Sequence, residues 1–470
     1  MQDGRGRRNW RRAGAAVSAG VLAAALAAGC TTYARRSRDL RLQLAAQNYE
    51  AALQGLEAIN NGGSRLLYHY ERGLVLHYQN RFAESNAALD QAELVLEDLY
   101  TRDLTREVAA FVTSDNLVQY RGERFEAGIL HYYKIMNYLH LGLEEEAAVE
   151  CRRLNHRLQV FGDQDGSYYR NDPFLQYLTG LVYSLVGQHA DANVSLRAAL
   201  AAYRSLRQAY GVEFPAALAC DLRDNAALVG GAADAEAAAA ATRCAPLDSA
   251  AARLGTLNLF LEVGYVPARL ESKIFLPIYK NEIKEDLDHA AFARDLARRR
   301  GRPVARELKL EYLLEVAMPV LAATPTPVEY SRVRPVAADG TSLAPATTDL
   351  VENLAPLAAQ AFQEHEGEIL VRAVVRSLAK YLATRETKKK SGDVAGWAMN
   401  AMGLATETAD TRGWSTLPEK ILMSRLRLPE GKYSLEVELL DRSGRHQGEL
   451  RIPDIAIRRG QSAFLNYRVF

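Results

Sequence analysis

The sequence predicts an α+β multidomain protein: an N-terminal helical-repeat solenoid, followed by an antiparallel β-sandwich that a helical insertion interrupts. Three observations predict this class. Apolar residues recur at helical spacing in self-similar segments over residues 30–210, alternate with polar residues over 256–346 and 411–470, and return to helical spacing over 347–410. With 470 residues, 48% of them hydrophobic, the chain can bury more than one core.

Residues 1–29 are predicted to be a secretion signal. Arginines precede an apolar run at 15–28 that is shorter than the roughly 20 helical residues needed to cross a bilayer. The run ends in Leu26-Ala27-Ala28-Gly29-Cys30, which resembles the lipobox of bacterial lipoproteins. The resemblance implies that the Cys30 thiol takes a diacylglycerol and that the new N-terminal amine is acylated. Thr31, where aspartate would retain the protein at the inner membrane, favours the outer membrane; an ordinary signal peptide is the alternative.

Charge and cysteine content narrow the classes of partner. The 58 Lys and Arg residues balance 57 Asp and Glu residues, so no bulk basic field points to nucleic acid. No Cys/His spacing typical of a metal site occurs. An oxidising compartment permits a Cys220–Cys244 disulfide, with free thiols as the alternative, and Cys151 is expected in the core.

Three segments of the helical half share one pattern around a predicted turn. The turns are Asn80, Gly142 and Gly187, and a partial match precedes them at Gln47. Small residues at fixed offsets let paired helices approach closely, and one pair alone cannot bury its apolar face. These segments resemble tetratricopeptide repeats with insertions; the residues seven before each turn are Gly73, Ile135 and Gly180, and those nine after are Leu89, Cys151 and Leu196.

One tyrosine recurs in each of the three repeats. Tyr70, Tyr132 and Tyr177 occupy the same register, which faces the concave groove in tetratricopeptide repeats. The resemblance therefore predicts a tyrosine ladder that contacts an extended peptide of a partner protein. The alternative is that the three rings pack between helices.

The second half is predicted to follow a linker. Residues 211–255 lose helical periodicity and are rich in Ala and Gly, so we expect a linker or insertion. Alternation on both sides of Gly264–Pro267 predicts a hairpin at 256–276. The strands of 411–470 bury one face only, and 256–346 is their expected partner.

The helical insertion at 347–410 carries a basic stripe. Arg372, Arg376 and Lys380 are four residues apart on one helix face. A solvated face is the expected interpretation, and a contact with anionic lipid or glycan is the alternative.

A specific motif joins the insertion to the last strands. Residues 406–418, Thr-Glu-Thr-Ala-Asp-Thr-Arg-Gly-Trp-Ser-Thr-Leu-Pro, resemble an uncharacterised family of bacterial tetratricopeptide-like lipoproteins, and Tyr120–Glu126 also fits it. The resemblance implies the architecture above and no established activity. Asp410, Arg412 and Trp414 are expected to form a rigid corner, in which a bidentate ion pair lies beside an indole, and the corner is either structural or a contact surface.

Catalytic motifs are missing from the sequence. It contains no HExxH, Walker A or GxGxxG pattern, and Ser377–Lys380 matches SxxK without the companion motifs of penicillin-recognising enzymes. We therefore expect no enzyme, cofactor or metal. The expected function is an outer-membrane lipoprotein, anchored through Cys30 and facing the periplasm, that binds unidentified envelope proteins as a scaffold or assembly factor. The alternative is an enzyme that modifies peptidoglycan or glycan, or an activator of peptidoglycan synthesis.

Overall fold

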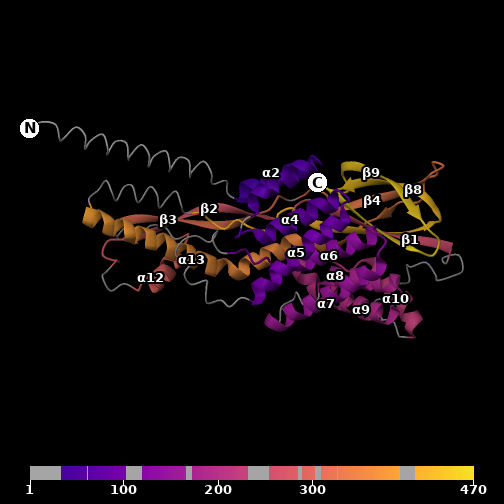
Figure 1. The fold of residues 1–470 in the computed structure, drawn as a ribbon, viewed down its shortest axis with the longest axis horizontal. Coiled ribbons are helices and arrows are strands. Elements are labelled where there is room, and N and C mark those ends of the chain that lie inside the picture. The colour runs from indigo at the N-terminus through magenta and orange to yellow at the C-terminus, as the bar shows by residue number, and fades with distance from the viewer. Residues whose placement is uncertain are drawn as a thin grey trace, which may run out of the picture.

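The computed structural model is a mixed α/β protein in which helices come first along the chain and strands follow, as the sequence predicts at this level. The first helices and most strands pack side by side in one body, and an arm of helices and strands extends from it (Figure 1). The structure describes residues 33–60, 62–101, 119–165, 172–230, 253–283, 288–301, 309–324, 326–391 and 408–470.

Consecutive helices form pairs in the first half of the described chain. In the three later pairs the two helices contact each other more than either contacts the next pair, because short turns hold them together. The pairs are α2 (Tyr33–Ala45) with α3 (Tyr49–Leu56), α4 (Arg65–Tyr78) with α5 (Phe82–Thr101), α6 (Arg124–His140) with α7 (Glu144–Asp165), and α8 (Pro173–Leu185) with α9 (His189–Tyr210); the 3-10 helix η1 (Glu57–Ile59) follows α3.

The turns of these pairs lie at the predicted residues. Gln47, Asn80, Gly142 and Gly187 adopt positive φ angles of 55°, 61°, 70° and 77°. In each turn the next residue donates its N–H to a carbonyl five residues earlier, as Arg81 does to Leu76 (2.9 Å). This is the Schellman arrangement, which ends a helix on a left-handed residue. The turn positions predicted from the repeat pattern are therefore confirmed.

The small residues of the repeats lie where helices approach closely. A Cβ atom built on Gly73 would lie 2.5 Å from Leu89 Cδ2, and one built on Gly180 would lie 2.6 Å from Leu196 Cδ2. The middle repeat has Ile135 and Cys151 at these positions, and both are fully buried. In the middle repeat the larger residue, Ile135, is therefore on the first helix of the pair. The smaller residue, Cys151, is at the matching position of the second helix.

The segment predicted as a linker contains a helix. Residues Ala216–Val229 form α10, which packs on α9 through Leu218, Ala219 and Leu222. Gly211 ends α9 at a φ of 65°, and Pro215 then precedes α10. The expected loss of helical periodicity over the linker or insertion at 211–255 is therefore corrected for this part, whose helix buries Leu218, Ala219, Asp221, Leu222, Asn225 and Ala226.

The strands form two four-stranded sheets and a two-stranded ribbon. One sheet has the order β10-β1-β7-β6 and the other β5-β4-β8-β9, and apolar side chains between the two form one buried cluster. The strands are β1 (Leu254–Val263), β2 (Ala268–Tyr279), β3 (Leu310–Ala322), β4 (Tyr330–Ala337), β5 (Ala346–Thr347), β6 (Asp349–Asn353), β7 (Lys420–Pro429), β8 (Gly431–Leu440), β9 (His446–Ile457) and β10 (Ser462–Val469).

Strand β1 is buried on both faces. Leu257, Leu259 and Leu261 face the second sheet, whereas Phe260 and Glu262 face the helical half. β1 pairs in parallel with β10 and antiparallel with β7, so the predicted hairpin at 256–276 is wrong and the pairing is not wholly antiparallel. Both edges of β1 are thus occupied, by β10 and by β7. β2 leaves this sheet and pairs with β3 instead. The predicted pairing of 256–346 with 411–470 is confirmed at β1–β7 and β4–β8.

The arm consists of the β2–β3 ribbon and two helices, α12 (His289–Arg298) and α13 (Leu354–Ser391), which share a buried cluster (Figure 1). Two expectations for 347–410 are corrected. Residues 349–353 form strand β6, which extends the sheet beside β7. Arg376 is 2% exposed, so the predicted solvated stripe of α13 is interrupted by a buried side chain.

Candidate functional site

The three tyrosines predicted to line an open groove have no exposed surface. Other parts of the same chain cover the surface that they line, so the predicted contact with an extended partner peptide is corrected at these positions. The sequence pattern located the rings and could not show what covers them. Tyr70 stacks on Trp414 with centroids 4.2 Å apart, Tyr132 donates to Glu262 Oε1 (2.8 Å), and Tyr177 donates to Asp221 Oδ2 (2.8 Å).

The segment that covers Tyr70 is anchored at the predicted corner. Arg412 donates through Nε and Nη2 to the two oxygens of Asp410 at 2.8 and 2.7 Å, in the bidentate geometry that fits a guanidinium to a carboxylate. The same guanidinium donates through Nη1 to the carbonyl of Gly63 (2.6 Å), just before α4. The corner therefore ties the chain before β7 to the helical half. Trp414, two residues further on, lies in the core and is 1% exposed.

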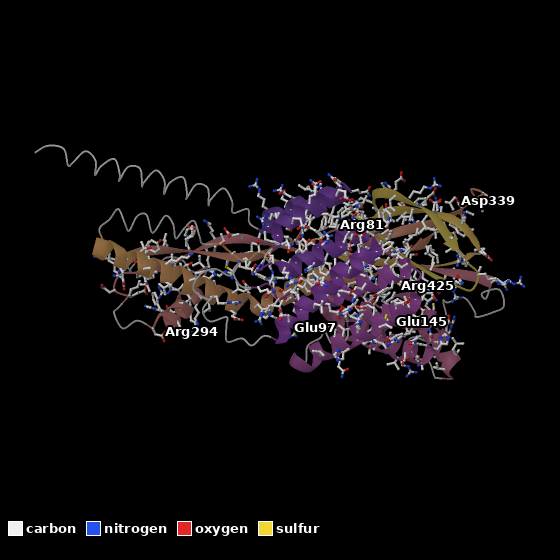
Figure 2. The ribbon with its side chains drawn as sticks, viewed as in Figure 1. Arg81, Glu97, Glu145, Arg294, Asp339 and Arg425 are labelled. Carbon is white, nitrogen blue, oxygen red and sulfur yellow. The ribbon has the colours of Figure 1, made fainter. Side chains whose placement is uncertain are left out.

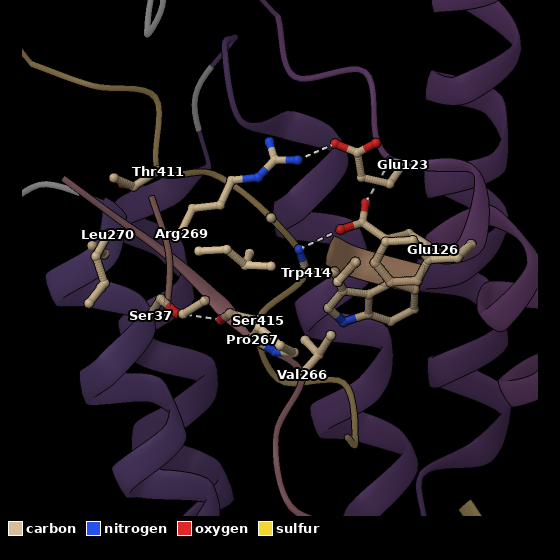
Figure 3. A pocket seen from close by; sticks show the side chains of 16 residues that line it. Ser37, Glu123, Glu126, Val266, Pro267, Arg269, Leu270, Thr411, Trp414 and Ser415 are labelled. Carbon is tan, nitrogen blue, oxygen red and sulfur yellow. Dashed lines mark hydrogen bonds and ion pairs between the residues drawn. The ribbon is translucent and has the colours of Figure 1, made fainter. Parts of the chain in front are cut away.

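A small cavity lies where α2, α6, the start of β2 and residues 411–415 meet (Figure 3). Its volume is about 40 Å³, room for one water molecule at the roughly 30 Å³ that each occupies in the liquid. Glu123, Glu126, Arg269, Ser415 and Trp414 contribute to its lining. The indole Nε1 of Trp414 has no hydrogen-bond partner within the described structure. The cavity suits ordered water better than an organic substrate.

Glu126 holds the Trp414 segment from the helical side. Its carboxylate accepts the backbone N–H of Trp414 (2.8 Å), the N–H of Glu123 (3.0 Å) and the hydroxyl of Tyr120 (2.8 Å). Burial, together with the nearby charge of Glu123, raises the pKa of Glu126 to about 7. Glu123 is in turn paired with Arg269 of β2. These bonds belong to a helix N-terminal capping box whose acidic member also binds a distant segment.

Glu71 of α4 makes the next contact along the same segment. Its carboxylate accepts hydrogen bonds from the hydroxyls of Thr416, Ser415 (3.4 Å) and Tyr33 (3.2 Å). Burial raises the pKa of Glu71 to about 7. Arg41 of α2 donates to the Ser415 carbonyl (2.8 Å). Residues 413–416 therefore lie between α2, α4 and α6, as a bound peptide would.

Glu262 of β1 is the third buried carboxylate. It accepts the hydroxyls of Tyr78, Tyr132 and Tyr133 at 2.6, 2.8 and 3.0 Å and the side-chain amide of Asn466 at 2.6 Å. Each donor is neutral, and four of them replace the water that the carboxylate loses on burial. The cluster joins α4, α6, β1 and β10 in one hydrogen-bonded unit.

A histidine extends this cluster without adding charge. The amide of Asn466 also donates to His77 Nε2 (2.7 Å), and His77 Nδ1 lies 2.6 Å from Asn137 Oδ1. Burial lowers the pKa of His77 to about 4, so the ring is neutral at physiological pH. A neutral ring that accepts at Nε2 and donates at Nδ1 satisfies both neighbours.

Two carboxyl groups meet between α8 and β6. Asp172 caps α8 by accepting the N–H of Leu175 (2.9 Å), and Glu352 of β6 accepts the N–H of Asn353 (2.8 Å). Burial raises the pKa of Asp172 to about 6, and burial with the Asp172 charge raises that of Glu352 well above its usual range. The charge of Asp172 opposes ionisation of Glu352, so Glu352 is the carboxyl of the two that more readily keeps its proton.

Two ion pairs between β7 and α10 also join the two halves. Arg425, labelled in Figure 2, pairs with Asp221. Arg427 pairs with Asp224 (3.1 Å), so α10 is tied to the sheet by two ion pairs. Asp221 also accepts the hydroxyl of Tyr177, which leaves its carboxylate fully engaged.

The remaining predicted site residues are placed in part. Cys30 and Cys244 lie outside the described residues, Cys220 is disulfide-bonded, and Cys151 is a buried free thiol whose pKa burial raises. No group of three or more His, Cys, Asp or Glu in the described ranges is placed to hold a metal ion. No described helix combines the length and apolar content needed to cross a bilayer.

Sequence reasoning missed the buried carboxylates. Glu71, Glu126 and Glu262 are of a residue type that is almost always exposed, so none of them is expected as a core residue. One signal was available for Glu71 and Glu126, because both lie among apolar residues on the predicted first helix of a repeat pair. No local signal marks Glu262, since β1 alternates as a half-exposed strand would.

Comparison with known proteins gives no assignment. The sequence matches no family model, and no curated protein is significantly similar to it.

Proposed function

We propose that this chain is a bacterial outer-membrane lipoprotein that is anchored through Cys30 and binds envelope proteins as a non-enzymatic scaffold. In this proposal the helix pairs are a tetratricopeptide-like solenoid and the two four-stranded sheets are a β-sandwich. The N-terminal pattern ending at Cys30 supports the anchor. The two halves act as one rigid body that presents its outer surfaces to partners.

One observation carries the proposal: the buried carboxylates between the two halves are engaged by donors of the same chain. Glu262 accepts four hydrogen bonds, and Glu71 and Glu126 accept bonds from residues 413–416. A general acid or nucleophile must reach a substrate, whereas Glu71 and Glu262 are bonded to other protein groups and Glu126 borders only the cavity of about 40 Å³, which is too small for one. Their geometry supports a fixed junction in place of catalysis.

A groove between α5 and α7 is the surface best suited to a partner. It encloses about 720 Å³. Asp90, Glu93 and Glu97 line it from α5, and Arg152, Arg153 and Arg157 line it from α7. Leu94 and Val149, 57% and 42% exposed, add apolar surface. Lys134 pairs with Asp90 and Glu93, and Arg157 pairs with Glu93 and Glu97 across the groove. Because these charges are already partnered, the exposed apolar side chains between the walls are what favours a protein segment.

The scaffold is tested by capture from detergent-solubilised envelopes. Wild type is compared with Leu94→Glu and Val149→Glu, and with Val194→Glu on α9 as the control, because Val194 is 68% exposed and lies outside the groove. We expect the groove variants to lose bound proteins that the control retains. Identical sets of captured proteins from all four chains would contradict the groove.

The anchor and the non-enzymatic role have separate tests. Radiolabelled palmitate should enter the wild type and not Cys30→Ala, and failure of labelling in the wild type would end the lipoprotein proposal. Purified protein incubated with peptidoglycan should release no soluble fragments. Turnover by the protein alone would favour the glycan-modifying alternative.

A further inference from the structure

A second cavity lies between α2 and α3, the first helix pair of the described chain, and encloses about 220 Å³. Its inner wall is apolar and consists of Leu40, Ala52, Leu56 and Ile59, none more than 7% exposed. Polar groups, such as the exposed Asp39, lie toward its opening. Ser37 and Tyr33 also line the cavity, but their hydroxyls are bonded to Ser415 and to Glu71 and Gly413, so the inner wall suits an alkyl chain better than a polar ligand.

The size of the cavity fits part of one fatty-acyl chain. A methylene group occupies roughly the volume of a water molecule in the liquid, about 30 Å³. The cavity of about 220 Å³ therefore holds roughly seven methylenes, the inner part of a single chain. It is too small for the several chains of a whole phospholipid.

The position of the cavity indicates which chain would enter it. Tyr33, the first described residue, lines the cavity, and Cys30 precedes it by three residues. Three residues span at most about 11 Å, so an acyl chain on Cys30 starts close to the opening. A lipid that is not attached to Cys30 has no such link to the opening of the cavity.

We propose that one acyl chain attached to Cys30 folds back into the α2–α3 cavity, a proposal that rests on the lipoprotein function above. A triacylated cysteine has three chains, and two are enough for stable membrane attachment. Moving the third chain from the membrane interior into the cavity exchanges one apolar environment for another, so it costs little free energy. Its insertion fixes how the helical half is oriented at the membrane.

Gly55 offers a way to fill the cavity without disturbing the fold. It lines the cavity from α3, and a Cβ atom built on it meets no atom within 4 Å. Gly55→Leu therefore places a side chain into open space. Gly367→Leu on α13 is the matched control, because a Cβ there also meets nothing within 4 Å and lies in a remote helix.

The test uses a dansyl-labelled undecanoic acid whose fluorescence rises in an apolar site. The mature chain from Thr31 onward, made without leader or lipid, should bind one equivalent. Gly55→Leu should weaken binding at least tenfold, and Gly367→Leu should leave it unchanged. The lipidated protein in nanodiscs should bind no probe at the cavity, because its own chain fills it.

The outcomes separate this proposal from the lipoprotein function. If palmitate labels Cys30 but the unlipidated chain binds no probe, or Gly55→Leu binds normally, the cavity proposal is wrong and the anchor stands. If the lipidated protein binds as much Gly55-sensitive probe as the unlipidated chain, the occupant is another lipid and the proposal is overturned. If palmitate labelling fails, both proposals fall.

Discussion

Gly73 tests whether the helix pairs pack as the repeat pattern requires. Gly73→Ala adds one methyl group to α4 at a point 2.5 Å from Leu89 Cδ2 and 2.6 Å from Leu89 Cγ. Favourable contact between two carbons requires about 3.5–4.0 Å, so the methyl overlaps its neighbour by about 1 Å. Leu89 has no exposed surface and is enclosed by the same core, so it cannot simply swing aside.

Two opposing effects set the size of the change. Overpacking a close-packed core typically costs about 1–3 kcal/mol. Replacing glycine by alanine inside a helix contributes about 0.5–1 kcal/mol of stability. We therefore expect Gly73→Ala to lower the free energy of unfolding by about 1–2 kcal/mol. Gly55→Ala on α3 is the control; it has open space around the new methyl and should stabilise the protein.

A double-mutant cycle in urea identifies the cause. Leu89→Ala removes the side chain that the new methyl meets, so Gly73→Ala in that background should become stabilising by about 0.5–1 kcal/mol. The change of sign is the result to look for, because a general defect of α4 would persist in both backgrounds. An equal cost with and without the leucine side chain would refute the packing argument, as would a stabilising Gly73→Ala in the wild type.

Three further predictions concern the junction between the halves. Trp414→Ala should lower the free energy of unfolding by about 3–5 kcal/mol. Trp414→Phe should lower it by far less, because the indole Nε1 makes no hydrogen bond in the described structure. Equal losses of the two variants in urea unfolding would contradict this. Glu262→Gln should lower the free energy of unfolding by about 1–3 kcal/mol, because its amide group faces tyrosine hydroxyl donors. The control Glu438→Gln breaks a surface ion pair with Arg332 and should lower it by less than about 1 kcal/mol. Similar losses for the two variants would show that the buried cluster adds no stability. Because burial raises the folded-state pKa of Asp172 from 3.8 to about 6, its contribution to stability should be fully present below about pH 4 and lost as the pH rises through about 6. Asp172→Asn, which keeps a side-chain oxygen to cap α8, should flatten this part of the pH dependence in thermal melts, and an unchanged slope would contradict the assignment to Asp172.

The features predicted correctly from the sequence are local ones. Asn80, Gly142 and Gly187 were located by spacing, and each ends a helix on a left-handed residue because the turn geometry depends on a few neighbouring residues. The Gly73–Leu89 and Gly180–Leu196 contacts follow for the same reason, since a helix pair joined by a short turn has few ways to align its residues.

The features predicted wrongly depend on distant partners. Alternation at β1 indicates two faces of different polarity and does not show what covers the polar face. Glu262 meets tyrosines of α4 and α6, and β1 pairs with β10 in place of β2. The register of Tyr70 was also correct, yet no local pattern shows that Trp414 of the same chain lies on its ring.

The cluster around Glu262 has a consequence for the order of events during synthesis. Glu262 is bonded to Asn466, 204 residues further along the chain. Until that residue has been made, β1 has no neighbour on one edge and the carboxylate remains hydrated, so the helices cannot seal over it. Pairings between such distant positions are slow to form because a long loop must close first. Nascent chains of this protein should therefore stay accessible to chaperones and proteases until translation has passed the last strand.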